Sequence, residues 1–178
     1  MKKLFITMEE YFDIVDDKDK IIGKDTRQNV HLKKLKHRAV HILLQNQNKE
    51  VFLQKRSPLK DVNPNCWDSS CSGHVLSGED YDTAAHRELT EELGLQLNQP
   101  LIKLFKLSAD AKTGNEFIWV YLGFSNGPFQ LNPQEIAEGN FYSFSWINFK
   151  LATEPESFSN AFAYIWQCFT GYKKCHLL

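Results

Sequence analysis

Three glutamates lie close together in the segment Arg87-Glu88-Leu89-Thr90-Glu91-Glu92. A helix over residues 82–93 would place Glu88, Glu91 and Glu92 at positions i, i+3 and i+4, so their carboxylates share one face. Like charges at this spacing repel each other, and a divalent cation removes that cost. Carboxylate oxygens without histidine or cysteine favour Mg²⁺, or Mn²⁺ in its place, over zinc. A solvated helix face explains these three residues alone as well, so the flanking positions decide.

The charge of the chain is uneven along the sequence. The formal net charge is −1, but residues 31–60 contain eight Lys or Arg and one acid, a net of +7. Residues 79–92 contain six acids and one arginine, a net of −5. An acidic, metal-binding helix that faces basic strands suits an enzyme that binds phosphates. The near-neutral total argues against a nucleic-acid partner.

The acidic segment needs a helix to position it, and the sequence predicts one. Ala85, Leu89 and Leu93 form an apolar stripe beside the glutamates, and Gly94 is a C-cap candidate. Before this helix we expect a β-hairpin at residues 11–23, a short basic helix at 26–36 and a second β-hairpin at 38–54. After it we expect strands at 101–107, 117–124 and 141–147, and a last helix at 156–169. The pattern predicts an α+β fold with a mixed sheet packed between helices, in one domain over residues 1–178.

Composition limits the class of protein. The chain has 178 residues, of which 42% are hydrophobic and 13% aromatic, enough for a buried core. No apolar run approaches the roughly 18 residues that span a bilayer, so we expect a soluble, cytoplasmic protein that does not bind membranes. Four cysteines (Cys66, Cys71, Cys168 and Cys175) fit reduced thiols better than a disulfide framework. The many aromatic residues could serve a core or a homodimer interface equally.

The spacing of the residues around the glutamates matches a known sequence motif. Gly73, five residues, Glu79 and seven residues lead to Arg87-Glu88-Leu89-x-Glu91-Glu92-x-Gly94-Leu95. Residues 73–95 thus match the Nudix box at every defined position, and the chain resembles the Nudix hydrolases. The resemblance implies an α/β/α sandwich in which the box forms a loop–helix–loop. It also implies Mg²⁺-dependent hydrolysis of a nucleoside diphosphate linked to another group.

The resemblance also implies a role for each residue of the box. Glu88 and Glu92 would bind the metal directly, and Glu91 directly or through water. The carbonyl of Ser72 would complete the site, and Glu79 would pair with Arg87. Glu88 is our first choice for the general base, and Glu116 or Glu135, outside the box, are alternatives.

More of the chain resembles one branch of the family, the proteins similar to isopentenyl diphosphate isomerase. The resemblance includes Phe12 to Asp16, His37 to Val40, Leu53 to Ser57, Trp67-Asp68 and Gly73 to Val75. The isomerase has a cysteine directly before the Gly-His pair, whereas this chain has Ser72 there, and Cys71 comes one residue early. On a strand, Cys71 would point to the opposite face. Isomerisation is therefore the alternative activity, and a non-catalytic nucleotide-binding module is a third.

The isomerase also holds a metal through histidines and two glutamates. His37, His74 and Glu116 match that set, but Gly114 replaces the first glutamate and His31 is offset by one residue. The three matching residues predict either a second or vestigial metal site, or packing and hydrogen bonding without a metal.

Phosphate groups are bound by cationic side chains, and three such side chains lie at the ends of expected strands. Arg56, Lys55 and Arg38 are the candidates, with Arg56 preferred because its planar fork suits a phosphate. The aromatic residues Phe117, Trp119 and Tyr121 alternate along one expected strand, where they would either stack on a base or pack in the core.

Overall fold

The computed structural model of the chain describes residues 9–176, with side chains described as far as Tyr172. Its main sheet has seven strands in the order β5-β4-β3-β8-β7, with β6 paired to β3 and β9 paired to β4. These strands are β3 (His37–Gln45), β4 (Val51–Arg56), β5 (Trp67–Asp68), β6 (Cys71–His74), β7 (Ile102–Leu107), β8 (Glu116–Phe124) and β9 (Ile136–Tyr142). Only β3 and β8 run parallel, and every other pair is antiparallel, so the sheet is mixed as expected.

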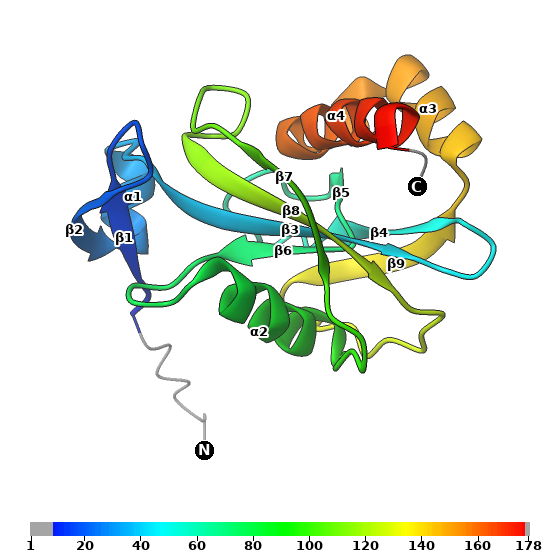
Figure 1. Cartoon of the computed structure of the whole chain (residues 1–178), viewed down its shortest axis with the longest axis horizontal. Coiled ribbons are helices and arrows are strands. Elements are labelled where there is room, and N and C mark those ends of the chain that lie inside the picture. The colour runs from blue at the N-terminus through cyan, green and yellow to red at the C-terminus, as the bar shows by residue number, and fades with distance from the viewer. Residues whose placement is uncertain (1–8, 177–178) are drawn as a thin grey trace.

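Helices cover both faces of this sheet (Figure 1). Helix α2 (Tyr81–Leu93) lies on one face, and α3 (Phe144–Thr153) and α4 (Asn160–His176) lie on the other. Side chains alternate across β8: Ile118, Val120 and Leu122 pack with α4, whereas Tyr121 packs with α2. The expected α/β/α sandwich is confirmed.

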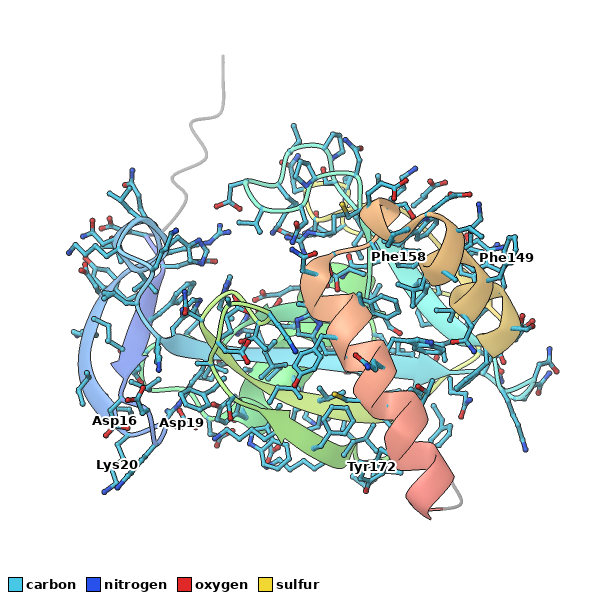
Figure 2. The ribbon with its side chains drawn as sticks, turned by 90° about the horizontal axis from the view of Figure 1, so that it is seen from above. Asp16, Asp19, Lys20, Phe149, Phe158 and Tyr172 are labelled. Atoms are coloured by element: carbon cyan, nitrogen blue, oxygen red, sulfur yellow. The ribbon has the colours of Figure 1, made fainter. Side chains whose placement is uncertain are left out.

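A second, two-stranded sheet stands at one end of the molecule (Figure 1). Strands β1 (Tyr11–Val15) and β2 (Ile21–Thr26) form the expected hairpin, and α1 (Arg27–Leu32) follows directly. Thr26 caps α1, because its side chain accepts a hydrogen bond from the Asn29 amide. Figure 2 shows Asp16, Asp19 and Lys20 at the tip of this hairpin.

Asp19 fixes the hairpin to the rest of the fold. Its carboxylate accepts hydrogen bonds from Arg38 Nε at 2.6 Å and Tyr81 Oη at 2.9 Å, and it also pairs with Lys106. These partners lie on β3, α2 and β7, so one partly buried carboxylate joins the hairpin to three elements. Arg38 is thereby committed to a structural contact.

Two sequence predictions for the C-terminal third are wrong. The expected strand at 141–147 ends at Tyr142, because Ser143 caps α3 by accepting a hydrogen bond from the Trp146 amide. The last helix starts at Asn160, four residues later than expected, after a 3₁₀ turn at Pro155–Ser157. Figure 2 shows Phe158 at this junction, where it is buried between α3 and α4.

Among the described residues, no helix is both long and apolar enough to cross a membrane. Cys66, Cys71 and Cys168 are free thiols, as expected. The side chain of Cys175 lies outside the described residues.

Candidate active site

Helix α2 is defined by its own sequence. Asp80 is the N-cap and accepts a hydrogen bond from the Thr83 amide, and Gly94 ends the helix with φ of 60°. The apolar stripe packs under the sheet, with Ala85, Leu89 and Leu93 fully buried. Burying this stripe turns the adjacent glutamate face towards strand β6.

Gly73 on β6 lets that face come close. A Cβ atom at position 73 would lie 2.0 Å from Cδ of Glu88 and 2.2 Å from its Oε1. Real side-chain atoms do not approach so closely, so the first glycine of the box is required for Glu88 to lie against the strand. Glu88 is buried at this contact.

Arg87 organises the rest of the box. Its guanidinium contacts Glu79 through two hydrogen bonds, of 2.9 and 2.8 Å, so the implied pair is present. It also donates to Glu88 at 2.6 Å, to Glu91 at 3.1 Å and to the carbonyl of His74 at 2.9 Å. Burial acts to lower the pKa of Arg87, but Glu79 and Glu88 raise it above its ordinary value. The cation therefore holds the loop, the helix and the end of β6 together.

Glu92 is held from two strands. One of its oxygens accepts hydrogen bonds from Nε2 of Gln54 at 3.1 Å and from the Ser72 amide at 3.2 Å. Burial raises the pKa of Glu92. The pKa of Glu88 is raised mainly by burial and, to a smaller extent, by the charge of the neighbouring Glu92. Arg87, the cation in contact with Glu88, is shared with two other carboxylates, so it does not offset the charge of both buried carboxylates. Hard oxygen donors in this state fit a divalent cation such as Mg²⁺.

These residues surround a cavity of about 110 Å³, which we call the carboxylate chamber. It is lined by Glu10, Arg27, Lys60, Ser72, Gly73, His74, Leu76, Glu88, Glu91, Glu92, Asn132 and Glu135. The structure thus brings the predicted Ser72, Glu88, Glu91 and Glu92 to one space. It also brings Glu135 there, but not Glu116.

A second cluster lies next to this chamber. Its members are His31 from α1, His37 from β3, His74 from β6 and Glu116 from β8. One ligand atom from each lies within 4.8 Å of the others, the one such group of three or more among the described residues. The parallel register sets His37 directly opposite Glu116, and Nε2 of His74 lies 3.1 Å from Oε1 of Glu116 and 3.3 Å from Nε2 of His31.

His31 is the member that sequence spacing excluded. It is offset by one residue along the chain, but it projects from a helix, where neighbouring positions differ by about 100° in direction. The position of α1 against the sheet therefore decides whether His31 reaches the cluster, and an offset of one residue does not prevent it. The structure therefore adds His31 to His37, His74 and Glu116.

The protonation state of this cluster suits a metal. Nδ1 of His37 lies 2.9 Å from the Leu35 carbonyl and so donates to it, which leaves the buried Nε2 of His37 without a hydrogen-bond partner. Burial lowers the pKa of His74 to about 4. Burial acts to raise the pKa of Glu116, but the contacts with His37 and His74 hold it well below its usual value. Neutral imidazoles around an ionised carboxylate are the ligand forms that a transition metal binds.

The histidine cluster opens into a cavity of about 240 Å³, which we call the histidine chamber. Besides the cluster, its lining includes the cations Arg27, Lys34, Arg56 and Lys60. Five residues line both chambers: Arg27, Lys60, Ser72, Gly73 and His74. The two chambers are therefore neighbours, with two cations at their boundary.

Of the three cations chosen from the sequence, only Arg56 lines a chamber. It donates to Asp68 at 3.3 Å and to the Val62 carbonyl at 3.1 Å. Lys55 pairs with Glu138 and lies over the Trp67 ring, and it lines neither chamber. Arg38 is bound to Asp19 and also lines neither.

Sequence reasoning missed Arg27 and Lys60. Arg27 begins α1, and Lys60 lies in the loop between β4 and β5. Lys60 was counted within the basic segment, but nothing local distinguishes it from the other lysines. Only the folding of these segments over β6 shows that they face the box.

The aromatic strand belongs to the core. Phe117 and Tyr121 are buried, and Trp119 packs in the cluster under α2. The Tyr121 hydroxyl donates to Asp82 at 2.6 Å. None of the three aromatic residues lines either chamber.

Cys71 lies on the α2 face of the sheet, in the apolar cluster beneath that helix. Burial raises the pKa of its thiol. Ser72, the next residue on β6, lines both chambers. The alternation expected for these two residues is present.

Comparisons with known proteins identify the family of this chain. The NUDIX domain model matches residues 35–162. An isopentenyl-diphosphate Delta-isomerase of Pectobacterium atrosepticum is 32% identical over 151 residues, which cover 82% of this chain and 83% of that protein. An uncharacterised Nudix hydrolase of Yersinia pestis is 33% identical over 129 residues, 72% of this chain and 70% of that protein. A crystal structure of a Deinococcus radiodurans protein superposes with a TM-score of 0.80 at 28% identity, covering 89% of this chain and 98% of that one. The chain belongs to the Nudix family.

Proposed function

We propose that this protein is a Mg²⁺-dependent Nudix hydrolase that cleaves the pyrophosphate of a nucleoside diphosphate linked to another group. The observation that supports this proposal is the pair of buried carboxylates, Glu88 and Glu92, held against Gly73 and Ser72. Two neighbouring carboxylates are costly to bury when Arg87, the arginine in contact with Glu88, is shared with two other carboxylates, and an intact box preserves this arrangement. A protein that only bound nucleotides would have no need for this arrangement.

The residues of the site have separate proposed roles in metal binding, positioning and phosphate binding. Glu88 and Glu92 would hold the metal, with Glu91 and the Ser72 carbonyl beside them. Bound Mg²⁺ would neutralise phosphate oxygens and lower the pKa of water. Arg87 fixes the helix and the loop through Glu79, so the carboxylates keep their positions during turnover. Arg27, Arg56 and Lys60 supply the positive charge that a diphosphate requires.

The base is a separate question. Glu88 was the first choice from sequence, but Arg87 donates to it at 2.6 Å, which reduces its capacity to accept a proton. Glu116 is engaged by His74 in the other chamber. Glu135 lines the carboxylate chamber and pairs with Lys60, a flexible side chain, and not with Arg87, which is held by several partners, so we favour Glu135.

A panel of nucleotides and nucleoside diphosphate derivatives tests this function. Phosphate or nucleotide release is measured with and without Mg²⁺ for wild type, Glu92→Gln and the matched surface variant Glu138→Gln. We expect Mg²⁺-dependent release by wild type and Glu138→Gln and almost none by Glu92→Gln. Equal activity in all three proteins would contradict the proposal.

Isomerisation of isopentenyl diphosphate is the second candidate, and the histidine cluster is the observation that favours it. Ser72 and Gly114 oppose it, since they replace groups that the isomerase uses. Cys71 cannot substitute, because it is buried on the α2 face with a raised thiol pKa. Incubation of wild type and Cys71→Ala with isopentenyl diphosphate under reducing conditions, followed by NMR, decides the matter. An allylic product that depends on Cys71 would establish the isomerase.

A further inference from the structure

Lys60 lies at the boundary of the two chambers and binds a carboxylate of one of them. Its ammonium pairs with Glu135, and its side chain is only 19% exposed. Glu135 lines the carboxylate chamber together with Glu88 and Glu92. Lys60 therefore neutralises an acid of the proposed hydrolytic site while it also faces the neighbouring cavity.

The backbone holds both partners in place. The Ser57 amide donates to the Glu135 carbonyl at 2.8 Å, and the Lys60 amide donates to the Ser57 carbonyl at 3.2 Å. On the other side, the Glu135 amide donates to the Asn132 carbonyl at 3.0 Å, and the Asn132 amide donates to the Glu92 carbonyl at 2.9 Å. The pair is thus built on a hydrogen-bonded frame that reaches the end of α2. Within that frame, the four-carbon stem of Lys60 can turn its ammonium without moving the backbone.

The second boundary cation is less free to move. Arg27 donates two hydrogen bonds to Asp61, of 2.9 and 3.2 Å. A diphosphate that extends from the histidine chamber to the carboxylate chamber has to pass these two cations, since both line both cavities. A phosphate carries more negative charge than a single carboxylate, so it competes with Glu135 for Lys60.

Building on the proposed hydrolase, we propose that Lys60 exchanges Glu135 for a phosphate of the substrate, and that the exchange frees Glu135 as the proton acceptor. In the step that follows, the water oxygen forms a bond to phosphorus and the bridging P–O bond breaks. The leaving phosphate takes the electron pair of that bond, and the water proton passes to a Glu135 oxygen. Until substrate arrives, Glu135 stays paired with Lys60. The ion pair therefore couples arrival of the phosphate to release of the base.

Binding of imidodiphosphate, a non-hydrolysable diphosphate, tests the exchange by calorimetry in the presence of Mg²⁺. Glu135→Gln removes the competing carboxylate, so the probe binds about fivefold tighter than to wild type. Lys60→Met removes the phosphate contact, so the probe binds at least about tenfold more weakly. The matched changes Glu138→Gln and Lys150→Met remove members of surface ion pairs outside both chambers and leave the affinity unchanged.

Kinetics with a hydrolysed substrate provide the second measurement. Glu135→Gln lowers kcat by about 100-fold or more with a lower KM, whereas Lys60→Met mainly raises KM. Lys60→Arg keeps the cation and stays near wild-type affinity, which controls for misfolding of the loop. An affinity in Glu135→Gln that is unchanged or weaker overturns the exchange, even where wild type hydrolyses its substrate. Affinities that move as stated in a protein without hydrolytic activity overturn the hydrolase and retain the exchange.

Discussion

The two chambers share five lining residues but differ in the balance of charged side chains around them. In the carboxylate chamber, Glu88 and Glu92 are buried with raised pKa values, and the guanidinium of Arg87 that contacts Glu88 is shared with other carboxylates. In the histidine chamber, His74 already hydrogen-bonds Glu116, whose pKa is held well below its usual value. Five carboxylates and two cations line the first chamber, whereas two carboxylates and four cations line the second, so only the first requires a further cation to balance its charge. Metal dependence should therefore be strong in the first chamber and weak in the second.

Removal of a carboxylate should produce the largest difference between the chambers. Glu92→Gln keeps the shape but loses the charge of a proposed metal ligand, so we expect Mg²⁺-dependent hydrolysis to fall by about 1,000-fold. His37→Asn changes the other chamber, and we expect hydrolysis to change by less than about tenfold. Steady-state kinetics of both variants check this, and similar losses in both would show that the chambers work as one site.

Adding a methyl group at Gly73, which lines both chambers, should lower the rate of hydrolysis almost as strongly. In Gly73→Ala the new Cβ would meet Cδ of Glu88, so the helix or the carboxylate must move. A displacement of about 1 Å costs an enzyme about 100-fold in rate. Gly171→Ala is the matched control, because a Cβ there meets nothing within 4 Å. Kinetics together with a thermal melt separate misplacement of Glu88 from unfolding.

The difference between the chambers also explains what the sequence could predict. The carboxylate chamber is built mainly from residues 72–92, where the caps and apolar stripe of α2 and the close approach at Gly73 act locally. The histidine chamber joins residues from α1, β3, β6 and β8, over positions 31–116. Its assembly depends on the parallel register of β3 and β8, which no local pattern encodes. The spacing of His31 was misleading because His31 lies on α1, and the position of that helix against the sheet sets where its side chain reaches.

The same contrast applies to the fold. The two N-terminal hairpins, α1, α2, β7 and β8 were predicted because turn residues separate them clearly, whereas the short strands β5 and β6 were not predicted. The segment 141–147 was wrong because its aromatic residues resemble a strand, while the decisive signal, the Ser143 cap, is one side chain. Arg27 and Lys60 could not be chosen, because their role depends on loops folding over β6.

The buried carboxylates should make the metal-free protein sensitive to pH. A carboxyl whose folded pKa lies above its unfolded value of about 4 stabilises the fold at low pH, and this contribution is lost as the pH rises through the folded pKa. We expect the free energy of unfolding without metal to fall by about 2 kcal/mol between about pH 5 and pH 8. Mg²⁺ should reverse the loss, and Glu92→Gln should reduce both the loss and the effect of Mg²⁺. Denaturant melts across this range measure it, and a flat profile without metal would contradict the charge assignment.

The histidine chamber should bind a transition metal without help from the box. Co²⁺ is a suitable probe because its visible spectrum reports nitrogen ligation directly. We expect His31→Ala to weaken Co²⁺ binding by about tenfold, since one of four ligands is lost. The exposed His86 on α2 is a matched control, and His86→Ala should leave the titration unchanged. Glu92→Gln should also leave it unchanged, which separates the two chambers by a measurement other than activity.

The smallest expected effect concerns the hairpin that packs against the histidine cluster. Phe12 on β1 stacks on His74 with ring centroids 4.5 Å apart, and Asp19 anchors that hairpin through Arg38, Tyr81 and Lys106. Burial acts to raise the pKa of Asp19, but these partners lower it overall, so its contribution is present above about pH 4 and is lost as the pH falls. Asp19→Asn should therefore cost about 1 kcal/mol at neutral pH and less in acid. Phe12 of the hairpin lies directly on His74, whereas the hairpin reaches α2 through Asp19 only at Tyr81, the first residue of that helix. The variant should therefore weaken Co²⁺ binding a few-fold and change hydrolysis less. Equal loss of both activities would mean that the hairpin supports the whole sheet and that the two chambers are not separately built.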